Sequence, residues 1–191
     1  MEFDFPITQN NPISAAFLQK GIYNFSNALQ YVRHLPYGRN PDKTRMESVL
    51  EEGRGTCSTK HALLCKLAQV HDHNEVRLCM GLYSMNGLNT PRVATTLAAH
   101  HLDYIPEAHN YLSIEGIRVD CTSARSRPED FVADLLEETF ILPEQITEYK
   151  VRYHRNYLQQ WLQQHPEIPY TLEVLWAIRE QCILDLSRPQ E

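Results

Sequence analysis

Residues 109–122, HNYLSIEGIRVDCT, decide the expected fold, because two alternating segments flank a short turn. A two-residue turn at Glu115-Gly116 predicts a β-hairpin in which side chains alternate between two faces. His109 and Asp120 then lie on one face as diagonal neighbours, about 7–8 Å apart between Cα atoms, whereas a one-residue slip would separate them. The opposite face is apolar and consists of Leu112, Ile114, Ile117, Val119 and Cys121.

A second stretch, residues 53–68, reads GRGTCSTKHALLCKLA and predicts a tight turn followed by a helix. Thr56 or Ser58 can cap this helix, so Cys57 lies in its first turn or directly before it. A helix N-terminus lowers the pKa of a thiol, because the aligned peptide dipoles favour negative charge there. None of the other cysteines is expected at such a position: Cys65, Cys79, Cys121 and Cys182.

Thiol catalysis needs a thiolate, a base and a group that orients the base. The hairpin offers the last two, so Cys57, His109 and Asp120 are the candidate catalytic residues. His61, four residues after Cys57 on the same helix, is the alternative base.

The remaining chain shows neither repeats nor a long linker. Apolar residues at helical spacing predict helices over 13–35 (with a break at Gly21), 44–52, 128–140, 143–164 and 171–186. Alternation predicts a strand over 76–83, and the segment 90–106 could hold another near 93–97. We therefore expect one α+β domain over residues 1–191. Its core at 36–125 would pack the nucleophile helix on a small antiparallel sheet, and C-terminal helices at 128–186 would pack onto that core.

Composition narrows the class of protein. The 191 residues are 42% hydrophobic and 22% charged, with a net charge of −6 and no basic stripe, so no nucleic-acid partner is expected. No stretch approaches the roughly 18 apolar residues that span a bilayer. Residues 1–10 lack the pattern of a signal peptide, so a cytoplasmic protein is expected. The five widely spaced cysteines are then free thiols rather than a disulfide framework.

Three blocks occur in the order Cys, His, Asp: Gly55-Thr56-Cys57-Ser58, His109-Asn110-Tyr111-Leu112 and Val119-Asp120-Cys121-Thr122. Together with the strand at 75–81, they resemble the transglutaminase-like superfamily of papain-type cysteine enzymes. The resemblance implies a papain-like core in which Cys57 is the nucleophile, His109 the base and Asp120 the orienting acid. It implies acyl transfer through a thioester, without a cofactor, on a peptide, protein or small amide substrate.

This sequence departs from the family pattern at two positions. Cys121 stands where members often carry Pro, and the aromatic Tyr111 follows the histidine only at the second position. Protease, deamidase and cross-linking activities are not separated by the sequence, and neither is the oligomeric state. One alternative is a noncatalytic binding or scaffold module. The other is an arylamine N-acetyltransferase-like enzyme, which shares the Cys-His-Asp order, uses an acyl-CoA donor and usually has a Gly-Gly turn that Gly53-Arg54-Gly55 matches in part.

Several residues are candidates for binding the substrate. The backbone N–H of Cys57 is the expected first oxyanion donor, with Tyr37 or Asn40 as candidates for the second. A substrate carboxylate could meet an arginine, and Tyr111 is an aromatic candidate near the base; the arginines are Arg39, Arg54 and Arg125. Surface positions are the alternative for the arginines.

Paired histidines raise the possibility of a metal site. These are His71 with His73, and His100 with His101. Zinc sites usually contain cysteine pairs two residues apart, and no such pair occurs in this chain. We therefore expect no catalytic metal.

Overall fold

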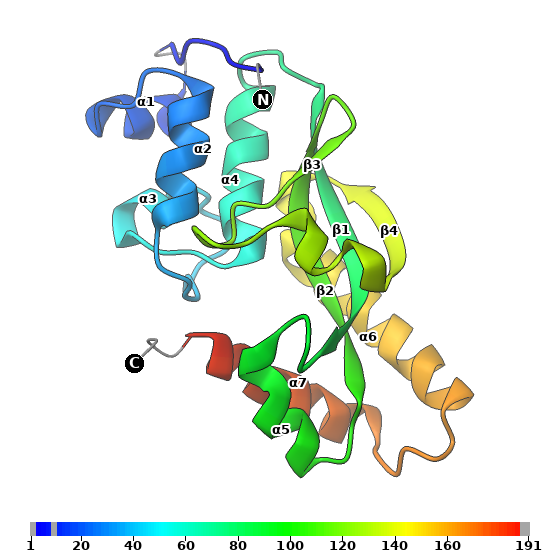
Figure 1. Ribbon diagram of the computed structural model, residues 1–191. Coiled ribbons are helices and arrows are strands. Elements are labelled where there is room, and N and C mark those ends of the chain that lie inside the picture. The colour runs from blue at the N-terminus through cyan, green and yellow to red at the C-terminus, as the bar shows by residue number, and fades with distance from the viewer. Residues whose placement is uncertain (1–2, 9–10, 188–191) are drawn as a thin grey trace.

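The computed structural model describes residues 3–8 and 11–187, so the expectation for the N-terminal residues 1–10 lies partly outside it (Figure 1). The helices are α1 (Pro12–Gln19), α2 (Phe25–His34), α3 (Ser48–Glu52), α4 (Cys57–Gln69), α5 (Ala94–Ala99), α6 (Glu148–Gln164) and α7 (Leu172–Ser187). The strands are β1 (Val76–Asn86), β2 (Tyr104–Ile114), β3 (Ile117–Val119) and β4 (Leu135–Ile141).

The strands form one antiparallel sheet in the order β3-β2-β1-β4. Its centre is the pair of β1 and β2, each 11 residues long. In the hairpin of β2 and β3, Ile114 lies opposite Ile117 and Leu112 opposite Val119. The even register expected for this hairpin is therefore confirmed, as is an α+β fold with a small antiparallel sheet.

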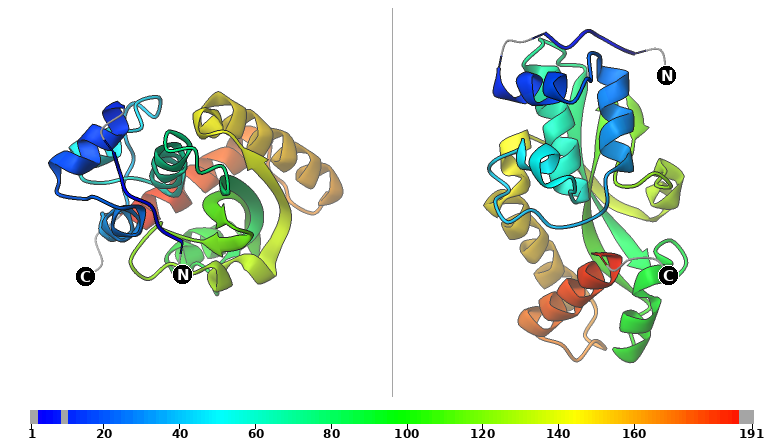
Figure 2. Two further views of the ribbon diagram at one scale, coloured as in Figure 1. Left: turned by 90° about the horizontal axis from the view of Figure 1, so that it is seen from above. Right: turned by 90° about the vertical axis from the view of Figure 1, so that its left-hand side faces the viewer.

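Helices cover the sheet at both ends of the long β1–β2 pair. The right-hand view of Figure 2 shows α1 to α4 at one end and α5 and α7 at the other. The first group encloses α4, in which every side chain from Cys57 to Cys65 is buried. A second apolar cluster, around α5, α6 and α7, includes Trp161, Leu175 and Ile178. The N-terminus of α4 lies where these two helical groups approach each other along the sheet (Figure 1).

The helix expected over 128–140 is wrong. Two short 3-10 turns, Pro128–Asp130 and Val132–Asp134, lead into strand β4 instead. This strand fills the free edge of β1 with Ile141 opposite Leu78, and such pairing overrides local propensity. The C-terminal α-helices therefore begin at Glu148 rather than near 128.

One further expectation is corrected, and the expected break at Gly21 is confirmed. The segment 93–97 is helical, because Val93 and Leu97 are both buried at the four-residue spacing of one helical face. The region 13–35 contains two helices, which are separated at Gly21, where φ is +74°. A positive φ suits glycine and ends the first helix.

Candidate active site

A tight turn presents Cys57 as the first residue of α4. The backbone of Gly55 donates to Pro36 O at 3.2 Å and accepts from Gly38 N at 3.2 Å. A Cβ at Gly55 would lie 2.9 Å from Lys60 Cγ, so this close approach requires glycine. Thr56 then caps α4 through a reciprocal pair of hydrogen bonds with Thr59. The N–H of Cys57 lies in the first helical turn, whose N–H groups have no acceptor within the helix.

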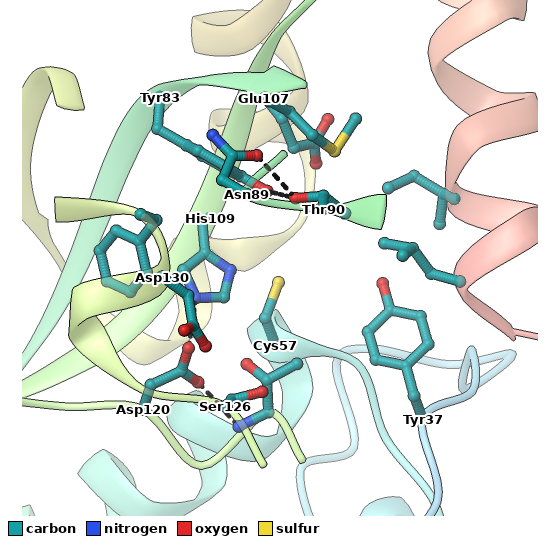
Figure 3. A pocket seen from close by; sticks show the side chains of 15 residues that line it. Tyr37, Cys57, Tyr83, Asn89, Thr90, Glu107, His109, Asp120, Ser126 and Asp130 are labelled. Atoms are coloured by element: carbon teal, nitrogen blue, oxygen red, sulfur yellow. Dashed lines mark hydrogen bonds and ion pairs between the residues drawn. The ribbon is translucent and has the colours of Figure 1, made fainter. Parts of the chain in front are cut away.

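The hairpin brings His109 and Asp120 together. His109 Nε2 lies 2.9 Å from Asp120 Oδ2, and the other oxygen accepts from Thr122 N at 2.8 Å. Figure 3 shows the imidazole with one nitrogen toward Asp120 and with Cys57 at its other side. The hairpin face that carries His109 and Asp120 is covered by aromatic rings, since Tyr83, Tyr111 and Phe131 all pack against His109.

The environment favours the charged forms of the thiol and the imidazole. Burial raises the pKa of Cys57, but the charge of Lys150 and the hydrogen bond from His109 outweigh burial and lower the pKa to about 6. Burial lowers the pKa of His109, but Asp120 and Cys57 together raise it to about 10. Both shifts favour a thiolate on Cys57 beside an imidazolium on His109. The other four cysteines have pKa values raised by burial to about 12: Cys65, Cys79, Cys121 and Cys182.

Lys150 of α6 is the functional residue that the sequence analysis missed. Its buried ammonium donates to Ser58 Oγ at 2.8 Å and to Asn110 Oδ1 at 2.6 Å. Ser58 directly follows Cys57, and Asn110 directly follows His109. Because 92 residues separate Lys150 from Ser58, only the folded chain reveals this contact.

His61 does not have the geometry of a base. Its Nδ1 lies 2.6 Å from the carbonyl oxygen of Cys57, and its Nε2 accepts from Cys121 N at 2.7 Å. Burial lowers the pKa of His61 to about 4, so the ring is neutral and both nitrogens are occupied. His61 instead joins the first turn of α4 to the segment that follows Asp120.

Lys60 strengthens the same connection. Its buried Nζ donates to Leu35 O at 2.5 Å and to Thr122 O at 2.8 Å. Burial lowers its pKa to about 8. The ammonium thus holds the backbone beside Asp120 against α4.

Two cavities open on either side of the Cys57 thiol. The histidine cavity, about 170 Å³ in volume, is lined by His109 and Asp120 together with Tyr83, Met85, Phe131 and Leu186 (Figure 3). The basic cavity, about 120 Å³ in volume, is lined by Arg39, Lys43, Lys150 and Arg179 together with Glu107 and Glu180. Cys57 and Tyr37 line both cavities, so a substrate that crosses the thiol can reach each of them.

The structure places the candidate binding residues Tyr37, Asn40 and Tyr111 in different environments. The ring of Tyr37 projects into the space beside Cys57, and burial raises its pKa well above the usual value, which keeps the phenol protonated (Figure 3). Asn40 is buried and fixes the turn, since it donates to Arg54 O at 3.1 Å and accepts from Thr59 Oγ1 at 2.7 Å. The Tyr111 hydroxyl is buried against Glu138.

The three candidate arginines also differ. Arg39 lines the basic cavity. Arg54 forms an exposed ion pair with Glu52 at 3.2 Å, and Arg125 is exposed; neither lines a cavity at Cys57.

His71 and His73 have other partners. His71 Nε2 accepts from Thr8 N at 3.0 Å, and His73 pairs with Glu75 at 2.8 Å. Within residues 3–8 and 11–187, no group of three or more His, Cys, Asp or Glu side chains could hold a metal ion. In the same ranges, no helix combines the length and apolarity needed to cross a bilayer.

Comparisons with protein-family models, curated proteins and solved structures found no match to this chain.

Proposed function

We propose that this protein is a cysteine-dependent amide hydrolase or acyl transferase that acts through a thioester on Cys57. The observation that carries the proposal is the geometry of the site: Cys57 begins α4, and the histidine beside it lies with Nε2 2.9 Å from Asp120 Oδ2, in surroundings that lower the pKa of Cys57. A thiolate at a helix N-terminus, a base within reach and a carboxylate that orients the base are the components of nucleophilic thiol catalysis.

The architecture supports a relation to the transglutaminase-like superfamily with its papain-like core. A helix that begins with the nucleophile packs against an antiparallel sheet, and the histidine and the acid come from one hairpin of that sheet. The order Cys57, His109, Asp120 along the chain agrees with that relation.

The reaction begins when the Cys57 thiolate attacks the carbonyl carbon of an amide, and a C–S bond forms. The carbonyl oxygen becomes an oxyanion, which the N–H of Cys57 can stabilise. His109 gives its proton to the leaving nitrogen as the C–N bond breaks, and this leaves a thioester and a free amine. Water or an acceptor amine then attacks the thioester, His109 takes its proton, and the thiolate is restored.

Tyr37 is the candidate for the second oxyanion donor. Its phenol lines both cavities at Cys57 and stays protonated at neutral pH, as a donor must. Tyr37→Phe is therefore expected to lower kcat about 10–10³-fold without changing the alkylation rate of the free thiol. An unchanged kcat would remove Tyr37 from the mechanism.

Acyl-enzyme trapping tests the proposal. The protein is incubated with a panel of activated anilides, nitrophenyl esters and acetyl-CoA, and its intact mass is followed for an adduct that peptide mapping locates. Acylation at Cys57 that disappears in Cys57→Ala and His109→Ala supports the proposal, whereas Cys65→Ala serves as the matched control. Adducts from acetyl-CoA alone would favour the acetyltransferase alternative. No adduct from any donor would favour a noncatalytic module.

A further inference from the structure

The basic cavity differs from the histidine cavity in the charge of its walls. Four basic side chains line it against two carboxylates: Arg39, Lys43, Lys150, Arg179, Glu107 and Glu180. Neither lysine nor arginine is among the described residues that line the histidine cavity, which beyond its catalytic groups combines aromatic and aliphatic side chains with polar ones such as Asn89, Thr90 and Asp130. A substrate that spans both cavities therefore meets very different chemistry on the two sides of the thiol.

Both carboxylates of the basic cavity are already neutralised by arginine. Glu107 accepts from Arg179 at 2.7 and 2.5 Å, and Glu180 accepts from Arg39 at 2.7 Å and from Arg179 at 2.6 Å. Buried or partly buried pairs of this kind hold their charges in place. The positive charge that remains uncompensated belongs to the two lysines of the cavity.

Those two lysines have different roles. Lys150 donates to Ser58 and Asn110, and its charge acts on the Cys57 thiolate. Lys43 is half-buried and, among the described residues, its ammonium makes neither a hydrogen bond nor an ion pair. Arg39 uses one donor nitrogen on Glu180, and a guanidinium carries five N–H donors, so it has further donors to offer. Lys43 and Arg39 thus have N–H donors and positive charge with which to bind an anion.

The direction of the reaction assigns each half of the substrate to a cavity. The leaving nitrogen takes its proton from His109, so the amine half lies in the histidine cavity. The acyl half then extends to the other side of Cys57, into the basic cavity.

We propose that the basic cavity is an anion-binding subsite for the acyl half of the substrate, in which Lys43 and Arg39 hold a carboxylate or a similar anionic group. This inference rests on the proposed function and narrows its substrate class to amides with an acidic acyl half.

Charged thiol reagents test the subsite without a known substrate. Methanethiosulfonates form a mixed disulfide with a thiolate and release methanesulfinate, so a 2-sulfonatoethyl and a 2-(trimethylammonio)ethyl reagent place opposite charges beside Cys57. The ratio of their rates, anionic over cationic, is measured for the parent, Lys43→Met, Lys43→Glu and the control Lys20→Met. We expect the ratio to fall about 3–10-fold in Lys43→Met and further in Lys43→Glu, and to stay unchanged in the control. High salt should make both decreases smaller, because it screens the charge.

A matched pair of substrates extends the test to acyl transfer. N-succinyl and N-butyryl anilides have acyl chains of equal length, and only the first ends in a carboxylate. Faster acylation of Cys57 by the succinyl compound, lost in Lys43→Met, supports the subsite.

The possible failures are distinguishable. An unchanged reagent ratio in both folded Lys43 variants, with Cys57 still reacting, would overturn the subsite and leave the proposed function standing. A Cys57 thiol that reacts with neither reagent would overturn both.

Discussion

Replacing Lys150 by Met removes the positive charge that most lowers the pKa of Cys57. Lys150 Nζ lies 2.8 Å from Ser58 Oγ, which lies 3.9 Å from Cys57 Sγ. These two distances limit the separation of Nζ and Sγ to roughly 7 Å, where an effective dielectric constant of about 20 gives an attraction of about 2.4 kcal/mol. Since about 1.4 kcal/mol corresponds to one pKa unit, the pKa of Cys57 should rise by about 1–2 units.

The assay is the rate of iodoacetamide alkylation at Cys57 from pH 4 to pH 10, followed by peptide mass spectrometry. In the parent the rate should reach half its maximum near pH 6, the pKa of Cys57. In Lys150→Met the midpoint should shift upward, so that at pH 6 most of the thiolate is lost.

Two further variants separate charge from structure. Lys150→Gln keeps a hydrogen-bond donor but removes the charge, so it should shift the midpoint as Met does. Lys66→Met removes a lysine of α4 that pairs with Glu144 on the surface, and it should leave the midpoint unchanged. Ser58 still donates to Asn110 at 3.0 Å without Lys150, which should keep the fold intact, as melting temperatures can check. An unchanged midpoint in a folded Lys150→Met protein would show that the charge of Lys150 does not lower the pKa of Cys57.

The remaining predictions concern the two carboxylates and the pH range. Asp120→Asn should leave alkylation of Cys57 near the parent rate but slow turnover about 10–10³-fold, because His109 loses its orienting charge; parent-like turnover would make Asp120 structural. Glu107→Gln should lower the free energy of unfolding by about 3 kcal/mol at neutral pH, measured by denaturant titration, because Arg179 loses a buried partner. The pKa of Glu107 is lowered from 4.5 to about 2, so its contribution to the free energy of unfolding is present above pH 4.5 and is lost as the pH falls through 2. If Glu107→Gln were still less stable than the parent by the same amount at pH 2, the ionised Glu107 would not be the source of the difference. Turnover should be highest between about pH 6 and pH 10, the pKa values of Cys57 and His109, and a maximum below pH 5 would exclude the thiolate–imidazolium pair.

Local patterns predicted those parts of the fold that local interactions determine. The hairpin register followed from a two-residue turn and from alternation, and the cap of α4 followed from Thr56. Strand β4 could not be predicted in this way, because Leu135–Ile141 is extended only through pairing with β1, more than 50 residues earlier. The residues Pro128-Glu129-Asp130, at the start of the helix that was expected over 128–140, suit the 3-10 turn that they form equally well.

The candidate site, like the fold, was predictable from the sequence only in part. Chain order and side-chain alternation predicted that Cys57, His109 and Asp120 form one site, and these residues are adjacent in the structure. The same reasoning did not reveal that Asn40 serves the turn or that both nitrogens of His61 bond to the backbone. A side chain with several possible partners is assigned to one of them only by tertiary packing.

The position of Lys150 has a consequence for how the nucleophile is activated. His109 and Lys150 approach the first turn of α4 from different elements, β2 and α6, and both lower the pKa of Cys57. In the proposed mechanism, the two positive charges beside Cys57 favour a thiolate before the substrate binds, so His109 would not have to remove a proton during the attack. The imidazolium is then already charged when the C–N bond breaks, and its high pKa, about 10, is set by Asp120 and by the thiolate itself. Once the sulfur has bonded to the carbonyl carbon, its negative charge is gone and the imidazolium becomes a stronger acid. Proton transfer to the leaving amine is therefore favoured at the step that needs it.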